Sequence, residues 1–327
     1  MQVKDRVLAA LEAQRGTYLS GQALAQTLQV SRSAVWKAIE QLREKGYPIQ
    51  AVPNRGYCLA PDSTILSAQS IAHWLKTPGL TLEVQGEVTS TNTLLRQRAE
   101  EGTAEGYVLV ATAQTQGRGR RDHQFYSPPD SGLYLSILVR PDLAAQDALL
   151  LTTCAAASVA LAIEDCAGVP AQIKWVNDIF CREKKVCGIL TEAALDLETG
   201  GLQYAIVGIG VNLFPPEGGF PPDLPEAGAV FSARPQGLEA RSRLAGAILD
   251  HFFTFYPHLA QRPFFDDYRR RSLVLGREIT VLERGQTRTA VALDLDEDFS
   301  LRVREADGTV RSLSSGEVRV RPVGKEH

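Results

Sequence analysis

The chain has 327 residues, of which 44% are hydrophobic and 22% charged, and its formal net charge is −3. These proportions are typical of a soluble globular protein with two or three domains, and they exclude a disordered or fibrous chain. Because we see no apolar run of transmembrane length, no secretory signal and no CxxC pair among five cysteines, we expect a cytoplasmic protein with reduced thiols and no membrane contact.

The first sixty residues are basic, whereas the rest of the chain is acidic. Residues 1–60 hold eight Lys/Arg and four Asp/Glu, so they carry a charge of +4, and the remainder carries −7. Apolar spacing predicts helices over 3–14, 21–28 and 31–45, with Ser20 and Ser31 as N-caps. Two short strands around a Pro-Asn-Arg-Gly turn follow at 47–60. We therefore predict a winged helix-turn-helix domain over residues 1–62.

A helix-turn-helix domain reads DNA with the start of its second helix. That position and the tip of the hairpin carry short polar and basic side chains, which we predict to contact DNA: Ser31, Arg32, Ser33, Lys37 and Arg55. We expect Trp36 to lie in the core or in an interdomain contact. The alternative is a packed three-helix domain with no role in DNA binding.

After a polar linker at 61–69, segments typical of strands alternate with segments typical of helices. Over residues 63–272 we predict a central α+β domain with a mixed sheet, which makes the whole chain an α/β multidomain protein. Its expected helices are 88–102, 145–167 and 238–271, its strands are 107–115, 132–140, 173–178, 185–195 and 202–213, and 214–228 is a loop rich in Pro and Gly. Short strands near the carboxyl terminus predict a small SH3-like β-barrel over 273–327.

The stretch GRGRR (117–121) follows a strand, as a phosphate-binding loop does. It lacks the Lys-Ser/Thr of a P-loop and the third glycine of a dinucleotide-binding loop, and GIGVN (208–212) lacks that glycine as well. Taken in isolation, GRGRR is equally compatible with a solvated turn or an RNA contact.

Five motifs occur in one order: TSTN (89–92), Gln114 with GRGRR, KWVND (174–178), KKVCGIL (184–190) and GIGVN. In this order and spacing they resemble the biotin protein ligases, in the bifunctional bacterial form that also represses the biotin operon. The resemblance covers nearly the whole chain. It implies that biotin and ATP form biotinyl-5′-adenylate, and that the biotinyl group passes to a lysine of the biotin carboxyl carrier protein of acetyl-CoA carboxylase.

The resemblance also implies roles for individual residues. Lys185 is the leading catalytic residue, together with Arg120 and Asp178, and Asp178 would also bind Mg²⁺. Biotin would be bound by Ser90, Thr91, Asn92, Gln114, Gly117, Arg118, Arg120, Lys185 and Gly188. ATP and the adenylate would be bound by Arg118, Arg120, Arg121, Phe125, Asn177 and Asn212. Capping of a helix or turn is the structural alternative for the 90–92 group and for Asp178.

The sequence departs from the family pattern at two places. Val176 replaces the proline of KWPND, and Asp122, His123, Gln124 and Phe125 replace a more basic stretch that ends in tryptophan. Phe125 keeps an aromatic face for adenine, but the positive charge is reduced. We therefore predict that the adenylate forms but is held less tightly than in an Asp122→Gly/His123→Arg double variant.

The repressor members of the family form a homodimer when the adenylate is bound, and the dimer binds two-fold operator DNA. We expect ligand binding to order the loops 117–125 and 214–228. Three alternatives stay open: a ligase with a vestigial DNA-binding domain, a biotin-sensing regulator without ligase activity, and a lipoate ligase.

Overall fold

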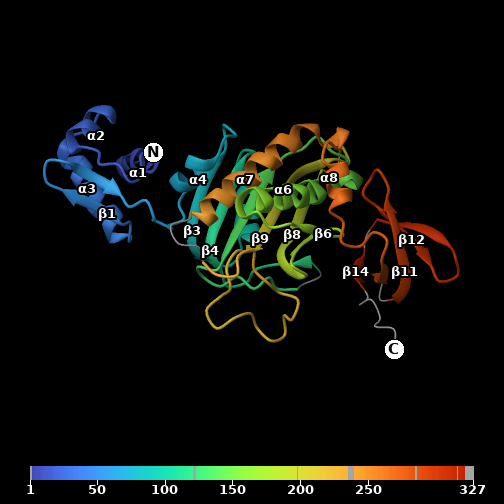
Figure 1. Cartoon of the computed structure of the whole chain (residues 1–327). Helices are drawn as coiled ribbons and strands as arrows, with labels where there is room; N and C mark the ends of the chain where they lie inside the picture. Colours follow the sequence, from blue (N-terminus) through green and yellow to red (C-terminus); the bar gives the residue numbers. More distant parts are fainter. Residues whose placement is uncertain are drawn as a thin grey trace.

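The structure is a computed structural model that describes residues 2–120, 123–196, 198–234, 239–283, 286–314 and 316–320. Three units follow one another in space as they do in sequence: a small helical domain, a central α/β domain and a carboxy-terminal sheet (Figure 1). The amino-terminal domain and the carboxy-terminal sheet lie at opposite ends of the molecule.

The amino-terminal domain is the predicted winged helix-turn-helix. It contains α1 (Val3–Ala13), α2 (Gly21–Thr27), α3 (Arg32–Glu44) and the antiparallel pair β1 (Ile49–Val52) and β2 (Gly56–Leu59). Ser20 and Ser31 cap α2 and α3 through their hydroxyl groups, as expected. Trp36 is 54% exposed on α3, so of the two places predicted for it, the core and an interdomain contact, the core is wrong.

A buried arginine joins this domain to the central one. Arg15 forms ion pairs with Glu12 of α1 and with Glu239, the residue before α7, and it donates a hydrogen bond to the Ser63 carbonyl at 2.9 Å. Burial raises the pKa of the Glu12 carboxyl, and Arg15 opposes this increase. The linker and the body therefore hold α1 in place through charged groups.

The central domain is built on one mixed seven-stranded sheet. Its strand order is β3-β4-β5-β9-β8-β7-β6, in which β3 and β4 are parallel and the other pairs antiparallel. The strands are β3 (Thr81–Val88), β4 (Tyr107–Gln114), β5 (Gly132–Val139), β6 (Gln172–Lys174), β7 (Asp178–Cys181), β8 (Lys184–Leu195) and β9 (Leu202–Asn212). The helices are α4 (Ala68–Trp74), α5 (Thr91–Glu100), α6 (Leu149–Ala167), α7 (Ala240–Phe255) and α8 (Phe265–Arg270), with 3-10 turns η2 (Ala145–Ala148) and η3 (Tyr256–Gln261).

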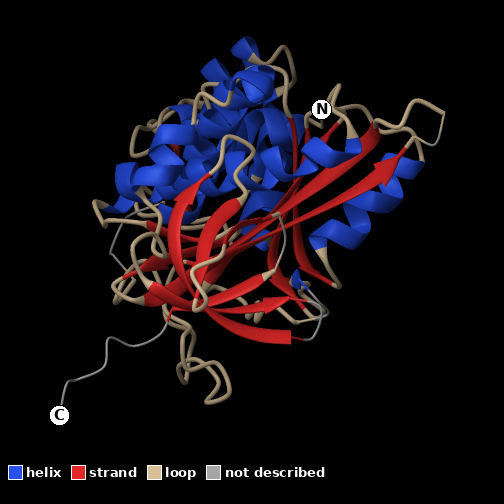
Figure 2. Cartoon of the chain, turned by 90° about the vertical axis from the view of Figure 1, so that its right-hand side faces the viewer, coloured by secondary structure: helices blue, strands red, loops and turns tan. Residues whose placement is uncertain are grey.

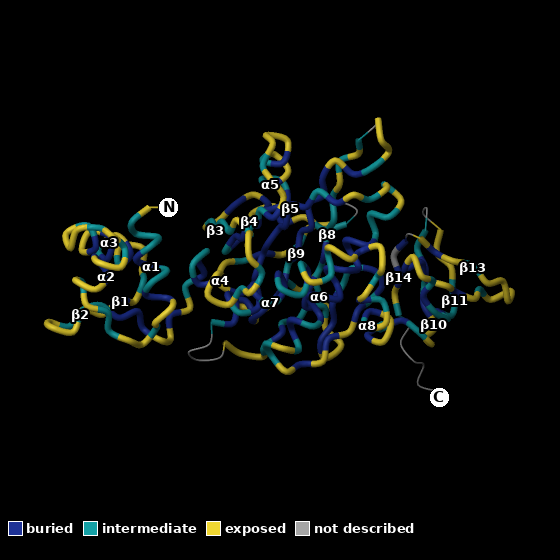
Figure 3. Tube along the Cα trace, turned by 90° about the horizontal axis from the view of Figure 1, so that it is seen from above, coloured by how far each residue is buried: buried dark blue, intermediate teal, exposed yellow. Residues whose placement is uncertain are grey.

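Helices cover both faces of this sheet. Most of them gather on one side of the strands (Figure 2), and in Figure 3 α5 lies on one side of the buried strands and α6, α7 and α8 lie on the other. The segment Ala145–Ala167 is long and apolar enough to cross a membrane, but 72% of its most apolar part is buried inside the domain. It is therefore a helix of the packed core, although its length and apolarity reach those of a membrane-spanning segment.

The carboxy-terminal unit is a five-stranded antiparallel sheet in the order β13-β12-β11-β10-β14. It contains β10 (Glu278–Glu283), β11 (Gln286–Leu295), β12 (Leu301–Glu305), β13 (Val310–Leu313) and β14 (Glu317–Val320). In the described part of these strands β13 and β14 do not pair, so the predicted barrel is open at this seam. Phe299 fixes the unit to the central domain, since it packs on Phe264 and Tyr268 and its carbonyl accepts a 2.8 Å hydrogen bond from Trp175 Nε1.

The predicted strand at 173–178 is instead a hairpin. β6 ends at Lys174, β7 begins at Asp178, and these two residues are paired across the turn. The Trp175–Val176 peptide bond in the turn is cis, and the Val176 carbonyl accepts a hydrogen bond from the buried Tyr268 hydroxyl at 3.0 Å. Residues distant in sequence thus hold the turn. Because these partners cannot be seen in the local sequence, the apolar residues of the turn suggested a continuous strand.

Candidate functional site

Three glycines on adjacent strands form the floor of the site. Gly188 of β8 pairs with Gly210 of β9, and Gly208 lies two residues away on the same strand. A Cβ atom on Gly208 would lie 2.1 Å from Asn92 Oδ1, and one on Gly210 would lie 2.6 Å from Phe125 Cε1. Glycine is needed at these positions, because only glycine leaves room for the side chains that lie directly on the sheet here.

A polar network closes one end of this floor. The Thr91 amide and hydroxyl donate to Gln114 Oε1 at 2.9 and 3.2 Å, and Gln114 Nε2 donates to Ser127 Oγ at 3.0 Å. The Ser90 hydroxyl caps α5 by accepting from the Thr93 amide. The capping role considered for this group thus holds for Ser90, while Thr91 and Gln114 face a small chamber that also contains the three glycines.

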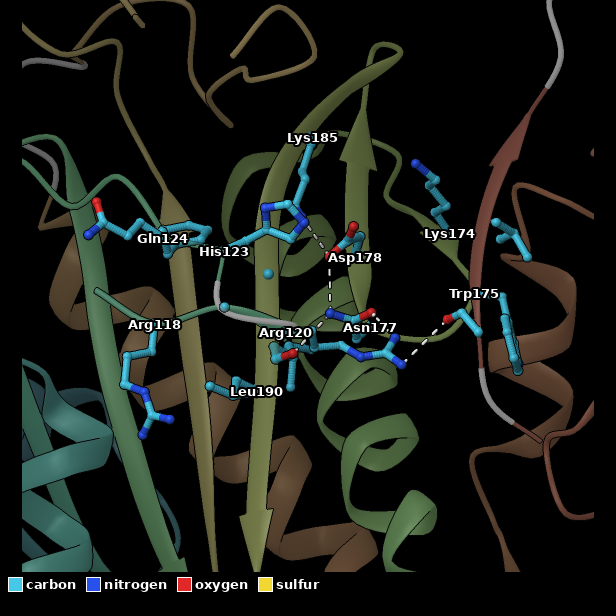
Figure 4. A pocket seen from close by; sticks show the side chains of 16 residues that line it. Arg118, Arg120, His123, Gln124, Lys174, Trp175, Asn177, Asp178, Lys185 and Leu190 are labelled. Carbon is cyan, nitrogen blue, oxygen red and sulfur yellow. Dashed lines mark hydrogen bonds and ion pairs between the residues drawn. The ribbon is translucent and has the colours of Figure 1, made fainter. Parts of the chain in front are cut away.

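A charged cluster forms the other end of the site. Lys185 Nζ lies 2.8 Å from Asp178 Oδ1, to which Asn177 Nδ2 donates at 3.2 Å. Arg120 Nη1 donates to Asn177 Oδ1 at 3.0 Å and Nη2 donates to the Gly316 carbonyl at 3.4 Å (Figure 4). The structure thus brings Lys185, Asp178, Arg120 and Asn177 into one chamber, and it adds the carboxy-terminal unit to the wall through Gly316.

Positive charge prevails in this second chamber. Besides Lys185 and two arginines it contains Lys174, whose Nζ lies 3.7 Å from Glu226 Oε2 and 5.3 Å from the centre of the Phe180 ring. Among the described residues that line the chamber, Asp178 is the sole carboxylate. Such a chamber suits a ligand with several negative charges.

The loop after β9 supports the backbone of Lys185. The Lys185 amide donates to the Glu226 carbonyl at 2.7 Å, and the Gly228 amide donates to the Lys185 carbonyl at 2.9 Å. Lys184 points elsewhere, since its Nζ donates to the Pro225 carbonyl at 2.8 Å. Full burial raises the pKa of the Cys187 thiol well above its ordinary value, so this thiol stays protonated.

The loop after β4 that begins with GRGRR (residues 117–125), here called the arginine loop, folds back over the glycine floor. The Phe125 amide donates to the Gly117 carbonyl at 2.9 Å, and a Cβ atom on Gly117 would lie 2.3 Å from the Phe125 carbonyl oxygen. The Phe125 ring lies on Gly188 and Gly210, between the two chambers. Arg121 and Asp122 lie outside the described residues, so their predicted roles receive no structural account.

Two predicted ligands lie at the edge of these chambers. Arg118 Nη1 lies 2.7 Å from Glu192 Oε1, and in Figure 4 its guanidinium points away from Lys185. Asn212 ends β9, with its side chain nearly buried and its carbonyl accepting a hydrogen bond from the Val230 amide at 3.0 Å. It does not line either chamber in this structure.

Several residues of the site were not predicted from the sequence. His123, Gln124 and Lys174 line the charged chamber, and Ser127 and Glu192 fix the residues that face the ligand space. Lys174 could have been found, because it begins the KWVND motif. Glu192 carries a weaker signal: it lies two residues beyond KKVCGIL and so points to the same side of β8 as Leu190.

The predicted DNA-contacting residues are all exposed on the amino-terminal domain. Ser31, Arg32, Ser33 and Lys37 are all exposed at the start of α3. Arg55, in the turn between β1 and β2, is also exposed and lies 4.3 Å above the centre of the Tyr18 ring. Helix and wing therefore present basic and short polar groups, as nucleic-acid recognition requires.

Comparisons with known proteins agree with these three units. Residues 4–58 match the HTH domain, residues 84–212 the Biotin/lipoate A/B protein ligase family, and residues 274–321 the Biotin protein ligase C terminal domain. The chain is similar to the bifunctional ligase/repressor BirA of Bacillus spizizenii, with 38% identity over 69% of this chain and 70% of the relative. It is 30% identical to the biotin–[acetyl-CoA-carboxylase] ligase of Mycobacterium tuberculosis over 72% of this chain and 88% of the relative.

A solved structure gives the same result. The biotin protein ligase from Aquifex aeolicus in complex with biotin and ATP is 27% identical, with a TM-score of 0.59 over 74% of this chain and 98% of that chain. The three family matches, the identity of 38% to a relative covered over 70% of its length and the fold of this solved structure therefore agree. The chain belongs to the biotin protein ligases, in the group that combines the ligase with an amino-terminal repressor domain.

Proposed function

We propose that this chain joins biotin to AMP in the two chambers above the glycine floor and then transfers the biotinyl group to a lysine of a carrier protein. One observation carries the proposal: the cluster of Lys185, Asp178 and Arg120 lies along the same glycine floor as the Gln114 network. A ligand with a neutral polar head, an apolar tail and a carboxylate matches the polar network, the glycine floor and the charged cluster in their order along the site.

Biotin would lie with its ureido ring against Thr91 and Gln114 and its tail along the three glycines. The Phe125 ring now lies on Gly188 and Gly210, so it must leave the floor when the tail enters. The Phe125 side chain would therefore turn away when biotin binds, while the loop backbone at Gly117 and Arg118 stays in place. The ring is then free to stack on adenine, the role that we predict for it.

The first half-reaction brings two anions together. A biotin carboxylate oxygen bonds to the α-phosphorus of ATP, the bond from this phosphorus to the bridging oxygen breaks, and pyrophosphate leaves. Lys185 stabilises the carboxylate and then the charge that develops on the α-phosphate, while Arg120 binds phosphate oxygens. Asp178 orients Lys185 across their 2.8 Å contact.

Mg²⁺ would act at the same chamber. A magnesium ion in such sites takes one or two carboxylates and completes its coordination with phosphate oxygens and water. Asp178 fits that requirement, because it is the carboxylate among the described residues that line the chamber. The ion would neutralise charge on the triphosphate.

The second half-reaction needs no nucleophile from the enzyme. The neutral ε-amine of the acceptor lysine attacks the acyl carbon of the adenylate, the bond from that carbon to the phosphate oxygen breaks, AMP leaves with the negative charge, and the proton lost by the amine passes to water. We expect the acceptor to be the biotin carboxyl carrier protein of acetyl-CoA carboxylase, and we place the reaction in the cytoplasm.

Mass spectrometry of a carrier domain tests this proposal. The purified chain, ATP and Mg²⁺ should add one biotinyl group to the carrier lysine, and lipoate in place of biotin should add nothing. A carrier that gains lipoate, or no group at all, would overturn the assignment to biotin.

We further propose that the adenylate-bound chain forms a homodimer that binds operator DNA through the surface of α3 and Arg55. Each Arg or Lys that contacts phosphate contributes about one unit to the dependence of log affinity on log salt concentration. In a gel shift with biotin and ATP, Arg55→Ala should therefore weaken binding and reduce that slope. An operator affinity that is unchanged after deletion of residues 1–62 would favour the alternative of a vestigial domain.

The prediction that the adenylate is held loosely also belongs here. His123 is exposed on the wall of the charged chamber. Retention of biotinyl-adenylate by the native chain should be lower than in the Asp122→Gly/His123→Arg variant, and equal retention would contradict it.

A further inference from the structure

The two described arginines of the arginine loop, Arg118 and Arg120, make different contacts. Arg120 Nη1 donates to Asn177, within the cluster around Lys185. Arg118 instead places Nη1 2.7 Å from Glu192 Oε1, and Figure 4 shows its guanidinium pointing away from Lys185 and Asp178. Both arginines therefore line the charged chamber, but only Arg120 joins the cluster around Lys185, whereas the Arg118 guanidinium pairs with a carboxylate of the sheet.

Glu192 is itself fixed by the wall of the biotin chamber. Its second oxygen accepts a 2.8 Å hydrogen bond from Asn92 Nδ2, which also donates to the Leu190 carbonyl at 3.2 Å. Asn92 Oδ1 lies 2.6 Å from the Ser136 hydroxyl. A residue larger than glycine at 208 would collide with Asn92, so the sheet leaves space for this asparagine.

The Glu192 carboxylate thus connects two parts of the site. One oxygen contacts α5 through Asn92. The other lies 2.7 Å from Arg118 of the arginine loop and 4.0 Å from Arg96 of α5. Arg118 follows Gly117, whose carbonyl closes the loop by accepting from the Phe125 amide. An Arg118 guanidinium held on Glu192 therefore fixes the base of the loop that carries Phe125 and Arg120.

Building on the proposed function, the geometry assigns Asn92, Glu192 and Arg118 to a brace that positions the arginine loop over the biotin chamber. Arg118 is then a positioning residue, in contrast to the direct contact with carboxylate and phosphate that the family resemblance implies. Arg120 and Lys185 contact the reacting groups. The brace acts on the binding of biotin, since it joins the loop to the biotin chamber, and it leaves the charge around the α-phosphate unchanged.

Steady-state kinetics of ATP–pyrophosphate exchange separate the two roles. Glu192→Gln keeps the size of the side chain but removes its charge, and Arg118→Ala removes the other partner. Since the Glu192 side chain is 22% exposed and that of Arg118 41% exposed, we expect each variant to raise the KM for biotin about three- to tenfold. The kcat and the KM for ATP should stay within about twofold of the wild type.

The double variant gives the sharpest readout. If the two residues act as one unit, Glu192→Gln/Arg118→Ala should raise the KM for biotin no more than the stronger single variant does. Arg118→Lys should recover part of the loss, and it replaces Arg118→Ala if that variant fails to fold. Glu305→Gln is a matched control, because Glu305 has 20% exposure and pairs with Arg311 and Arg288 in the carboxy-terminal sheet.

Two outcomes would overturn the brace. The first is a loss of kcat in Arg118→Ala with an unchanged Glu192→Gln enzyme, because it would place Arg118 on the reacting groups. The second is a Glu192→Gln enzyme with the KM of the wild type. Both differ from a failure of the proposed function, in which the wild type itself shows no exchange that depends on biotin.

Discussion

Replacement of Lys185 by methionine should abolish most of the adenylation activity while leaving the fold intact. The Lys185 side chain is 34% exposed and its partner Asp178 is 19% exposed, so water reaches the pair and an effective dielectric constant of about 20 applies. Two unit charges about 4 Å apart then interact by about 4 kcal/mol. If the attraction between Lys185 and the charge on the α-phosphate has this size and develops mainly in the transition state, its loss slows adenylation by about a thousandfold.

Single-turnover formation of biotinyl-adenylate, with enzyme in excess over biotin, is the appropriate assay because product release does not enter it. Lys185→Arg should recover more than a tenth of the wild-type rate, since it keeps the charge. Lys184→Met is the matched control: this neighbour donates to the Pro225 carbonyl, so its loss should change the rate less than threefold. A Lys185→Met enzyme within threefold of the wild type would refute the role of Lys185.

Three further predictions concern the support of the site. Gly208→Ala should lower stability by about 1–3 kcal/mol in urea unfolding and weaken biotin binding in calorimetry, because a Cβ would lie 2.1 Å from Asn92 Oδ1; unchanged values would contradict this. Trp175→Phe leaves the buried Phe299 carbonyl without its 2.8 Å donor and should cost about 1–3 kcal/mol, and an unaltered Tm would argue against that contact. Burial raises the pKa of the Cys166 thiol, and it raises the pKa values of the Cys154, Cys181 and Cys187 thiols more strongly. At pH 8 Cys166 should therefore react with a disulfide reagent before these three cysteines. Reaction of all four at equal rates would contradict the packing.

The sequence predicts the elements whose patterns are strong. The helix at 145–167 and the strands at 107–115 and 202–213 combine length with continuous apolarity, and each appears in the structure. The strand Thr81–Val88 was missed, because as an edge strand it is mostly half-exposed and has no clear alternation. The turn after Lys174 was missed because its apolar residues are buried by partners more than 90 residues away.

The candidate site likewise has residues that the sequence predicts and contacts that it does not. Lys185, Asp178 and Gln114 follow from motifs, and the structure brings each to the same floor. The connection between Arg118 and Glu192 could not be predicted, since the two residues are 74 positions apart and neither has a local pattern that names its partner. The position of Phe125 on the glycines likewise depends on the folded loop.

The central claim is that one site activates the biotin carboxylate with ATP. ATP–pyrophosphate exchange tests it most directly, because it reports the first half-reaction without a carrier protein or DNA. The account predicts that the purified chain exchanges labelled pyrophosphate into ATP when biotin and Mg²⁺ are present, and that lipoate does not replace biotin. Exchange that is absent with biotin, or that occurs equally with lipoate, would contradict it.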